Sequence, residues 1–147
     1  MEIKQVEINR LSEIVEMNKK VFENMYDWPV YELDDYKKRL EGVTPIIFIV
    51  EDDGKIVGNC ISFEKDNKFY LWILGVLKEY RNQGIASKLF ELREQYAREH
   101  NYKKIFAKVY NVSEEMLKLM IKRGYKIIEV KENLNPKYSA NILELSI

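Results

Sequence analysis

In the first third of this chain, apolar residues recur first at every second position and then at every third or fourth. These two spacings predict a strand followed by two helices. Apolar and polar residues alternate over Glu2–Ile8, as in a half-buried strand. Asn9 is expected to cap a helix in which apolar residues recur every three or four positions up to about Asn24. Asp27-Trp28-Pro29 interrupts that pattern, and Tyr31–Leu40 predicts a second helix.

The middle of the chain predicts three strands joined by tight turns. Pro45–Glu51 is a dense run of β-branched residues, and Ile56–Phe63 and Phe69–Leu77 continue the strand pattern. The polar turns Asp52–Lys55 and Lys65–Lys68 separate these runs, so hairpin connections are expected between the strands.

The second half alternates helical and strand patterns. A helix is predicted from about Gly84 to His100, followed by a strand over Ile105–Tyr110. A further helix runs from the expected N-cap Ser113 to Gly124, and two last strands are predicted beyond it, over Tyr125–Val130 and Asn141–Leu145. Patterning alone therefore predicts a mixed α/β or α+β domain.

The junction of the third hairpin strand with the following helix carries the candidate chemistry. The apolar run Leu71–Leu77 leads, through a charged turn, into Arg81-x-x-Gly84-x-Ala86. A helix start exposes unpaired N–H groups and partial positive charge, and small residues let an anionic group such as a pyrophosphate approach the backbone. Taken alone, the motif is better interpreted as a helix entry whose small residues serve packing.

Composition narrows the function classes. The 147 residues, 46% of them apolar and 33% charged, predict one folded domain spanning residues 1–147. Lys plus Arg and Asp plus Glu both number 24, which argues against a general nucleic-acid binder. Cys60 is the single cysteine and His100 the single histidine, so neither a disulfide framework nor a Cys- or His-based metal site is expected. Cys60 is expected to be a buried apolar residue and His100 a helix cap. No leader or membrane span is recognised, so a cytoplasmic protein is expected.

Charge is distributed unevenly along the chain. Lys78–Lys108 holds eight basic and four acidic residues, and Glu23–Glu41 holds six acidic and three basic ones. Two interpretations stay open: the stretches are solvated faces, or they meet an anionic and a cationic ligand respectively.

The segment Leu71–Ala86 resembles the acetyl-CoA-binding motif of the GNAT family of N-acetyltransferases, [Q/R]-x-x-G-x-[G/A]. Gly124-Tyr125 matches that family's Gly-Phe or Gly-Tyr signature, and the order of predicted elements resembles the GNAT fold along essentially the whole chain. The resemblance implies a three-layer fold. Its mostly antiparallel sheet would have about seven strands and four helices, and two central strands would splay apart to admit acetyl-CoA as co-substrate.

The resemblance also implies which positions bind acetyl-CoA: Leu74, Gly75, Val76, Arg81, Asn82, Gln83, Gly84, Ile85, Ala86, Ser87 and Ser113. The N–H of Leu74 would face the acetyl carbonyl and stabilise the oxyanion. The alternative for Leu74 to Val76 is an ordinary buried strand in which every backbone group is paired.

The sequence departs from the family at both proton-transfer positions. The central-strand glutamate of many members corresponds to Tyr70, and the tyrosine that protonates the departing thiolate corresponds to Met120. Tyr110 is the nearest phenol that could replace this tyrosine. Alternatively, the thiolate departs without a general acid, because the thiolate of a thiol with a pKa of about 8.5 is a tolerable leaving group. General base and general acid stay unassigned, with Tyr70 and Tyr110 as candidates.

The acceptor is expected to meet the segment between the first two helices. The candidate acceptor-binding aromatics are Tyr26, Trp28, Tyr31 and Trp72. Aromatic walls beside carboxylates suit an amine or ammonium group. The alternative is an acidic amphipathic helix with its aromatics in the core, and packing is also the preferred interpretation of Trp72. Alternation would place Tyr70, Trp72 and Leu74 on one strand face.

The leading hypothesis is an N-acetyltransferase that transfers an acetyl group from acetyl-CoA to a primary amine by direct attack in a ternary complex. The amine could belong to a small molecule, a peptide N-terminus or a lysine, with no nucleic-acid, membrane or metal partner. A second hypothesis is a non-catalytic acyl-CoA sensor or interaction module on the same fold, and a third is another class of nucleotide-binding protein. The oligomeric state is open, a dimer included.

Overall fold

The computed structural model describes all of residues 1–147 as seven strands and four α-helices, with short 3₁₀ turns between some of them. The strands are β1 (Glu2–Val6), β2 (Ile46–Asp52), β3 (Lys55–Lys65), β4 (Lys68–Val76), β5 (Lys104–Tyr110), β6 (Lys126–Lys131) and β7 (Ala140–Ser146). The helices are α1 (Leu11–Phe22), α2 (Leu33–Arg39), α3 (Ile85–Glu99) and α4 (Glu114–Lys122). The predicted order of elements is confirmed.

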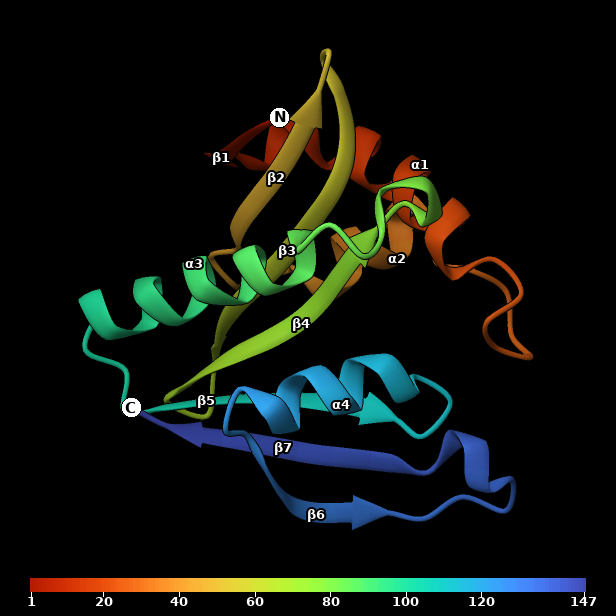
Figure 1. Cartoon of the computed structure of the whole chain (residues 1–147), viewed down its shortest axis with the longest axis vertical. Helices are drawn as coiled ribbons and strands as arrows, with labels where there is room; N and C mark the ends of the chain where they lie inside the picture. Colours follow the sequence, from red (N-terminus) through yellow and green to blue (C-terminus); the bar gives the residue numbers. More distant parts are fainter.

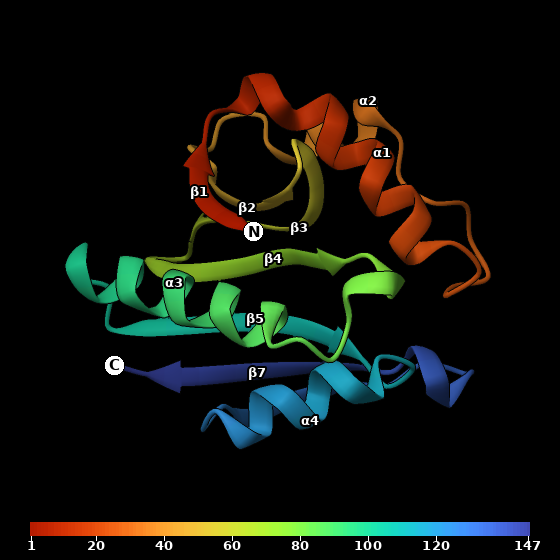
Figure 2. The same ribbon diagram turned by 45° about the horizontal axis from the view of Figure 1, so that its top comes forward.

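One sheet contains all seven strands, in the order β1-β2-β3-β4-β5-β7-β6. Every neighbouring pair is antiparallel except β4 and β5. Helices α1 and α2 lie on one face, and α3 and α4 lie on the other (Figures 1 and 2). This arrangement confirms the expected three-layer, mostly antiparallel fold.

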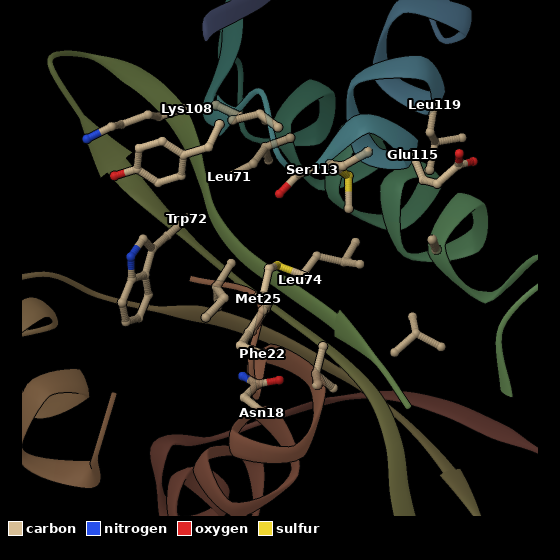
Figure 3. A pocket seen from close by; sticks show the side chains of 18 of the residues that line it. Asn18, Phe22, Met25, Leu71, Trp72, Leu74, Lys108, Ser113, Glu115 and Leu119 are labelled. Atoms are coloured by element: carbon tan, nitrogen blue, oxygen red, sulfur yellow. The ribbon is translucent and has the colours of Figure 1, made fainter. Parts of the chain in front are cut away.

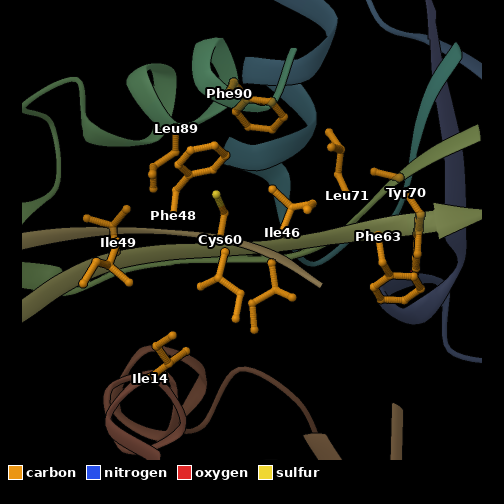
Figure 4. Packing of buried hydrophobic residues seen from close by; sticks show 14 of the residues in the cluster. Ile14, Ile46, Phe48, Ile49, Cys60, Phe63, Tyr70, Leu71, Leu89 and Phe90 are labelled. Atoms are coloured by element: carbon orange, nitrogen blue, oxygen red, sulfur yellow. The ribbon is translucent and has the colours of Figure 1, made fainter. Parts of the chain in front are cut away.

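The core lies on both faces of the central strands. Ile14 of α1 reaches the sheet from one side, while Leu89 and Phe90 of α3 pack from the other (Figure 4). Cys60 is completely buried between these layers, as expected, and burial raises the pKa of its thiol. A buried neutral thiol of this kind acts as an apolar side chain.

Strands β4 and β5 pair over a very short length. Only Phe69 with Ile105 and Tyr70 with Phe106 are in register. Beyond Tyr70 the two parallel strands diverge toward their carboxyl ends (Figure 1). The divergence leaves the remaining backbone of β4 without a strand partner on that side, which is the splay that the family resemblance implies.

A β-bulge interrupts β4 just after the point of divergence. Ile61 of β3 lies opposite Ile73, whereas the next residue, Ser62, lies opposite Leu71. Trp72 is therefore an extra residue in β4, and the bulge reverses the alternation of side chains beyond it.

The expectation that Tyr70, Trp72 and Leu74 share one face is wrong because of this bulge. Tyr70 lies opposite Phe63 and Leu74 opposite Cys60, and these two partners are three residues apart on β3. The ring of Trp72 stays on the side of Phe63, 6.2 Å from it. Leu74 therefore faces α3, whereas Tyr70 and Trp72 face α1 and α2.

Helix starts also differ from the sequence prediction. A 3₁₀ turn over Ile8–Arg10 precedes α1, so its N-cap is Arg10 and not Asn9, without a side-chain cap. Ser113 is the N-cap of α4, but its hydroxyl makes no capping hydrogen bond. His100 ends α3 as predicted, with Nδ1 2.9 Å from the carbonyl oxygen of Tyr96. None of the helices is long and apolar enough to cross a membrane.

Candidate active site

The divergence of β4 and β5 opens a cleft of about 1340 Å³. Of its 40 lining residues 25 are apolar, and they come from both faces of the sheet. Asn18, Phe22 and Met25 approach from the end of α1, and Glu115 and Leu119 approach from α4 (Figure 3). The cleft thus crosses the sheet where β4 and β5 separate.

One end of the cleft is the amino terminus of α3. The backbone N–H groups of the six residues Asn82 to Ser87 donate no hydrogen bond within the chain. Asn82 and Gly84 have φ values of 63° and 78°, which turn this backbone into a left-handed arch before the helix. Consecutive free N–H groups at a helix start form an anion site, because the helix dipole adds partial positive charge.

The residues present at this end fit a pyrophosphate. A Cβ built on Gly84 would meet nothing within 4 Å, so the position opens into free space where a side chain would stand in front of the backbone. Arg81 is exposed beside it, and its Nε donates to the carbonyl oxygen of Val76 at 3.3 Å. That bond leaves the terminal nitrogens of Arg81 available to a phosphate oxygen.

The backbone of β4 presents two free N–H groups to the cleft. The N–H of Leu77 donates to the carbonyl oxygen of Val57 in β3 at 2.9 Å. Because successive residues of a strand point their N–H groups to opposite sides, Gly75 also bonds toward β3, and Leu74 and Val76 point away from it. On that side β5 has already separated.

Most of the residues predicted from the sequence line this cleft: Tyr26, Trp28, Tyr31, Tyr70, Trp72, Leu74, Val76, Arg81, Asn82, Gly84, Ile85, Ala86, Ser87, Tyr110 and Ser113. Gly75 and Gln83 lie outside the lining. Gly75 instead lies against the buried amide of Asn18, which leaves no room for a Cβ there. A ligand contact through either backbone stays a prediction.

Aromatic side chains from distant segments meet at the mouth of the cleft. The rings of Tyr26 and Trp28 stack at 4.7 Å, and Tyr110 packs edge-on against them at 5.7 and 5.8 Å. Tyr138 completes the cluster, 4.9 Å from Trp28, and its hydroxyl accepts the N–H of Asp27 at 2.8 Å. Sequence reasoning missed Tyr138, since only the fold brings residues 26–28 to the β6–β7 connection.

A second aromatic group lies where β4 and β5 begin to diverge. Trp72 packs 5.2 Å from the buried ring of Tyr36, and Arg39 lies 5.8 and 5.9 Å from the rings of Tyr70 and Trp72. Burial raises the pKa of Tyr70, and the cations Arg39 and Lys108 oppose that rise. Tyr70 is therefore a neutral phenol at pH 7.

The charge at this face differs from what the acidic stretch Glu23–Glu41 suggested. Glu32 and Asp35 form a reciprocal capping box at the start of α2, and Glu32 also pairs with Lys19. The basic end of α2 also lines the cleft, through Lys38 and Arg39, together with Asp35. Two of the six acidic residues of this stretch, Glu32 and Asp35, thus cap α2.

Cations without carboxylate partners surround Tyr70. Lys65 lies 5.3 Å from its ring and Arg39 5.8 Å, and Lys108 lies 5.3 Å from the ring of Tyr110. None of these three joins an ion pair, whereas Lys68 pairs with Glu144 at 2.7 Å. Unpaired cations beside aromatic rings can attract an anionic group.

Neither family position for proton transfer holds the usual residue: Tyr70 stands in place of the glutamate and Met120 in place of the tyrosine. Met120 is almost completely buried in the cleft wall and cannot donate a proton. Tyr110 and Tyr70 are the phenols on β5 and β4 that line the cleft. Asn18, Arg39, Lys108 and Arg93 also line it, and no local sequence pattern had indicated them.

Comparison with known proteins gives a family match. A model described as the acetyltransferase (GNAT) family matches residues 11–125, which is more than half of the chain. A search of curated proteins finds no match.

Solved structures share the fold. The ribosomal-protein-S18-alanine N-acetyltransferase from Escherichia coli has a TM-score of 0.82 at 15% identity, covering 99% of this chain and 93% of that one. The protein smu.2055 from Streptococcus mutans UA159 also scores 0.82, at 18% identity, covering 99% of both chains. A putative streptothricin acetyltransferase from Bacillus anthracis, in complex with acetyl coenzyme A, scores 0.65 at 24% identity, covering 70% of this chain and 63% of that one.

Proposed function

This chain belongs to the acetyltransferase (GNAT) family, and we propose that residues 1–147 act as one domain that transfers an acetyl group from acetyl-CoA directly to a primary amine. Members of the family use acetyl-CoA as the acetyl donor. The observation that carries the proposal is the divergence of β4 and β5 beside six unpaired N–H groups at the start of α3. Acetyl-CoA is an extended thioester with an anionic end. The gap between the strands suits its extended part, and the unpaired N–H groups suit its anionic end.

The pyrophosphate would bind the N–H groups of Asn82 to Ser87, with Arg81 alongside. The pantetheine arm would then follow the free edge of β4 toward Tyr70. Val76 and Leu74 offer N–H groups along that edge, which supports a role for Val76 with the amide groups of the arm and for Leu74 with the acetyl carbonyl. Hydrogen bonding to the carbonyl oxygen stabilises the negative charge that develops there.

The state of Cys60 supports direct attack by the amine. That thiol is completely buried and burial raises its pKa, so it cannot serve as a covalent acetyl carrier. No other cysteine exists in the chain. The amine would therefore attack the thioester while both substrates are bound, after losing its proton to water or to a nearby base.

The acceptor would enter on the face of α1 and α2. The cluster of Tyr26, Trp28 and Tyr110 supplies flat apolar walls, and Arg39 and Lys108 supply unpaired positive charge. We therefore propose an acceptor amine on a small molecule or peptide that also carries an anionic group. Steering by these cations would favour such an acceptor over a purely cationic amine.

The experiment that tests the proposal is a calorimetric titration with acetyl-CoA, followed by an amine screen with thiol release as the signal. Saturable one-to-one binding together with turnover is expected. Binding without turnover of any amine would favour the acyl-CoA sensor on the same fold. Absence of binding at millimolar acetyl-CoA would contradict both functions.

A further inference from the structure

Arg93 of α3 is a buried cation in the wall of the cleft. Its side chain is among the largest that are fully buried in this protein, with 1% of the residue exposed. Its Nη1 makes one long hydrogen bond, 3.4 Å to the carbonyl oxygen of Ile73, and its Nε has no partner. A guanidinium has five N–H donors and stays charged, so this residue is far from satisfied.

No carboxylate neutralises Arg93. Its chain neighbour Glu94 already accepts two hydrogen bonds from Arg123, at 2.6 and 3.1 Å, and one from Tyr125 at 2.9 Å. The nearest aromatic ring to Arg93 is that of Phe90, at 4.7 Å. Burying an unpaired cation costs several kcal/mol, roughly, so a role with a bound anion would explain its presence.

The position of Arg93 relates it to the reacting group. The Ile73 carbonyl that it contacts and the Leu74 N–H belong to the same peptide unit but point in opposite directions, so Arg93 lies within one peptide of Leu74 without facing its N–H. The side chain of Leu74 faces α3, so Arg93 approaches β4 from that side. The thioester would lie at the free edge of this peptide, with its sulfur toward the α3 and α4 side of the cleft.

We propose that the guanidinium of Arg93 binds the thiolate of coenzyme A as it departs; this inference rests on the proposed function. The amine nitrogen attacks the carbonyl carbon, the C–N bond forms and the C–S bond breaks. The electron pair of the C–S bond leaves on sulfur, and the proton lost by nitrogen passes to solvent. The sulfur stays unprotonated next to Arg93, so no general acid is needed.

This role accounts for Met120. At the position where many family members carry a tyrosine acid, this chain has a methionine, which cannot donate a proton to the thiolate. A fixed cation stabilises a thiolate by lowering the pKa of the thiol. Arg93 thus replaces proton transfer by charge stabilisation.

Calorimetric titration with coenzyme A and with S-methyl-coenzyme A tests the assignment, because only the first can become a thiolate. In the wild type we expect the affinity for coenzyme A, relative to the methylated form, to rise about fivefold between pH 6.5 and 8.5, as a thiol pKa lowered by ~1 unit gives. Arg93→Met should abolish the rise while leaving affinity for S-methyl-coenzyme A within about twofold. Arg98→Met, on the exposed side of the same helix, is the matched control and should keep the rise in relative affinity with pH.

Equal and pH-independent affinities for the two ligands in the wild type would overturn the role of Arg93 but not the proposed function. Failure of both ligands to bind would overturn the proposed function as well. The other anion that could reach the guanidinium is a carboxylate on the acyl group. Titration with succinyl-CoA, which carries such a carboxylate, tests this alternative. Binding more than tenfold tighter than acetyl-CoA, lost in Arg93→Met, would assign Arg93 to an acyl carboxylate and overturn the thiolate role.

Discussion

The side-chain oxygen of Asn18 occupies the space that a Cβ atom on Gly75 would need. Asn18 is held there by a buried amide pair, in which Nδ2 of Asn59 donates to Oδ1 of Asn18 at 2.7 Å. Its own Nδ2 donates to the hydroxyl of Tyr36 at 3.1 Å. The glycine in β4 therefore lets α1 approach the sheet closely at the edge of the cleft.

Replacing Gly75 by alanine should destabilise the protein by about 1–3 kcal/mol, because the methyl group must displace a hydrogen-bonded amide from a packed core. Urea unfolding measures the loss. In an Asn18→Ala background the same substitution should cost much less, since the clashing oxygen is gone. Additive costs in the double variant would show that Asn18 is not the obstacle.

Gly84→Glu should weaken binding of coenzyme A far more than Gly84→Gln does. Both side chains strain the backbone equally at φ 78°, by about 1 kcal/mol, but only the glutamate places a negative charge at the proposed pyrophosphate site. We expect at least about a tenfold difference in Kd, corresponding to ~1.4 kcal/mol. Equal affinities by calorimetry would place the phosphates elsewhere.

Tyr110→Phe tests the candidate proton donor. The phenylalanine ring keeps the packing against Tyr26 and Trp28, and Arg93 would still hold the thiolate, so kcat should fall by less than about threefold. Steady-state kinetics with coenzyme A release as the signal measures this. A fall of about a hundredfold would instead identify the Tyr110 hydroxyl as the general acid.

Arg39→Glu should reverse the acceptor preference. With a pair of peptides that differ only in an Asp or a Lys beside the reactive amine, the wild type should favour the acidic one. Arg39→Glu should lower kcat/KM for that peptide about tenfold, or ~1.4 kcal/mol. Lys37→Glu makes the same charge change on α2 outside the cleft lining and should alter it less than about twofold. An unchanged preference in Arg39→Glu would remove this residue from the acceptor site.

Stability should fall at alkaline pH through Tyr36. Burial raises the pKa of this phenol to about 12, above the ordinary value of 10. A folded-state pKa above the unfolded one contributes stability that is present below pH 10 and is lost as the pH rises toward 12, up to ~2.7 kcal/mol in all. The free energy of unfolding in urea at pH 9 and 11.5 should fall less in Tyr36→Phe than in the wild type. The exposed Tyr31→Phe variant should keep the wild-type fall.

Local patterns in the sequence were sufficient for the order of elements and for the strand-to-helix junction at the start of α3, with its free N–H groups. The continuous apolar run of β2 reflects burial of both faces of that strand, and the helical spacing of α3 reflects burial of one helix face. Both patterns can be read from residues that are close together in the sequence. The arch from Arg81 to Ser87 is likewise local, since its geometry comes from a glycine and a helix start. This is why the motif and the elements on either side of it were predictable together.

Tertiary structure decided what surrounds that motif. The bulge at Trp72 turned Leu74 to the other face, and register of this kind depends on the partner strand. The Asn18–Gly75 contact, the arrival of Tyr138 beside Trp28 and the burial of Arg93 without a carboxylate join residues remote in sequence. The sequence by itself thus determined the fold and the helix start at which we propose that the phosphates bind. The acceptor face and the surroundings of the thioester depended on long-range packing, which no local pattern encodes.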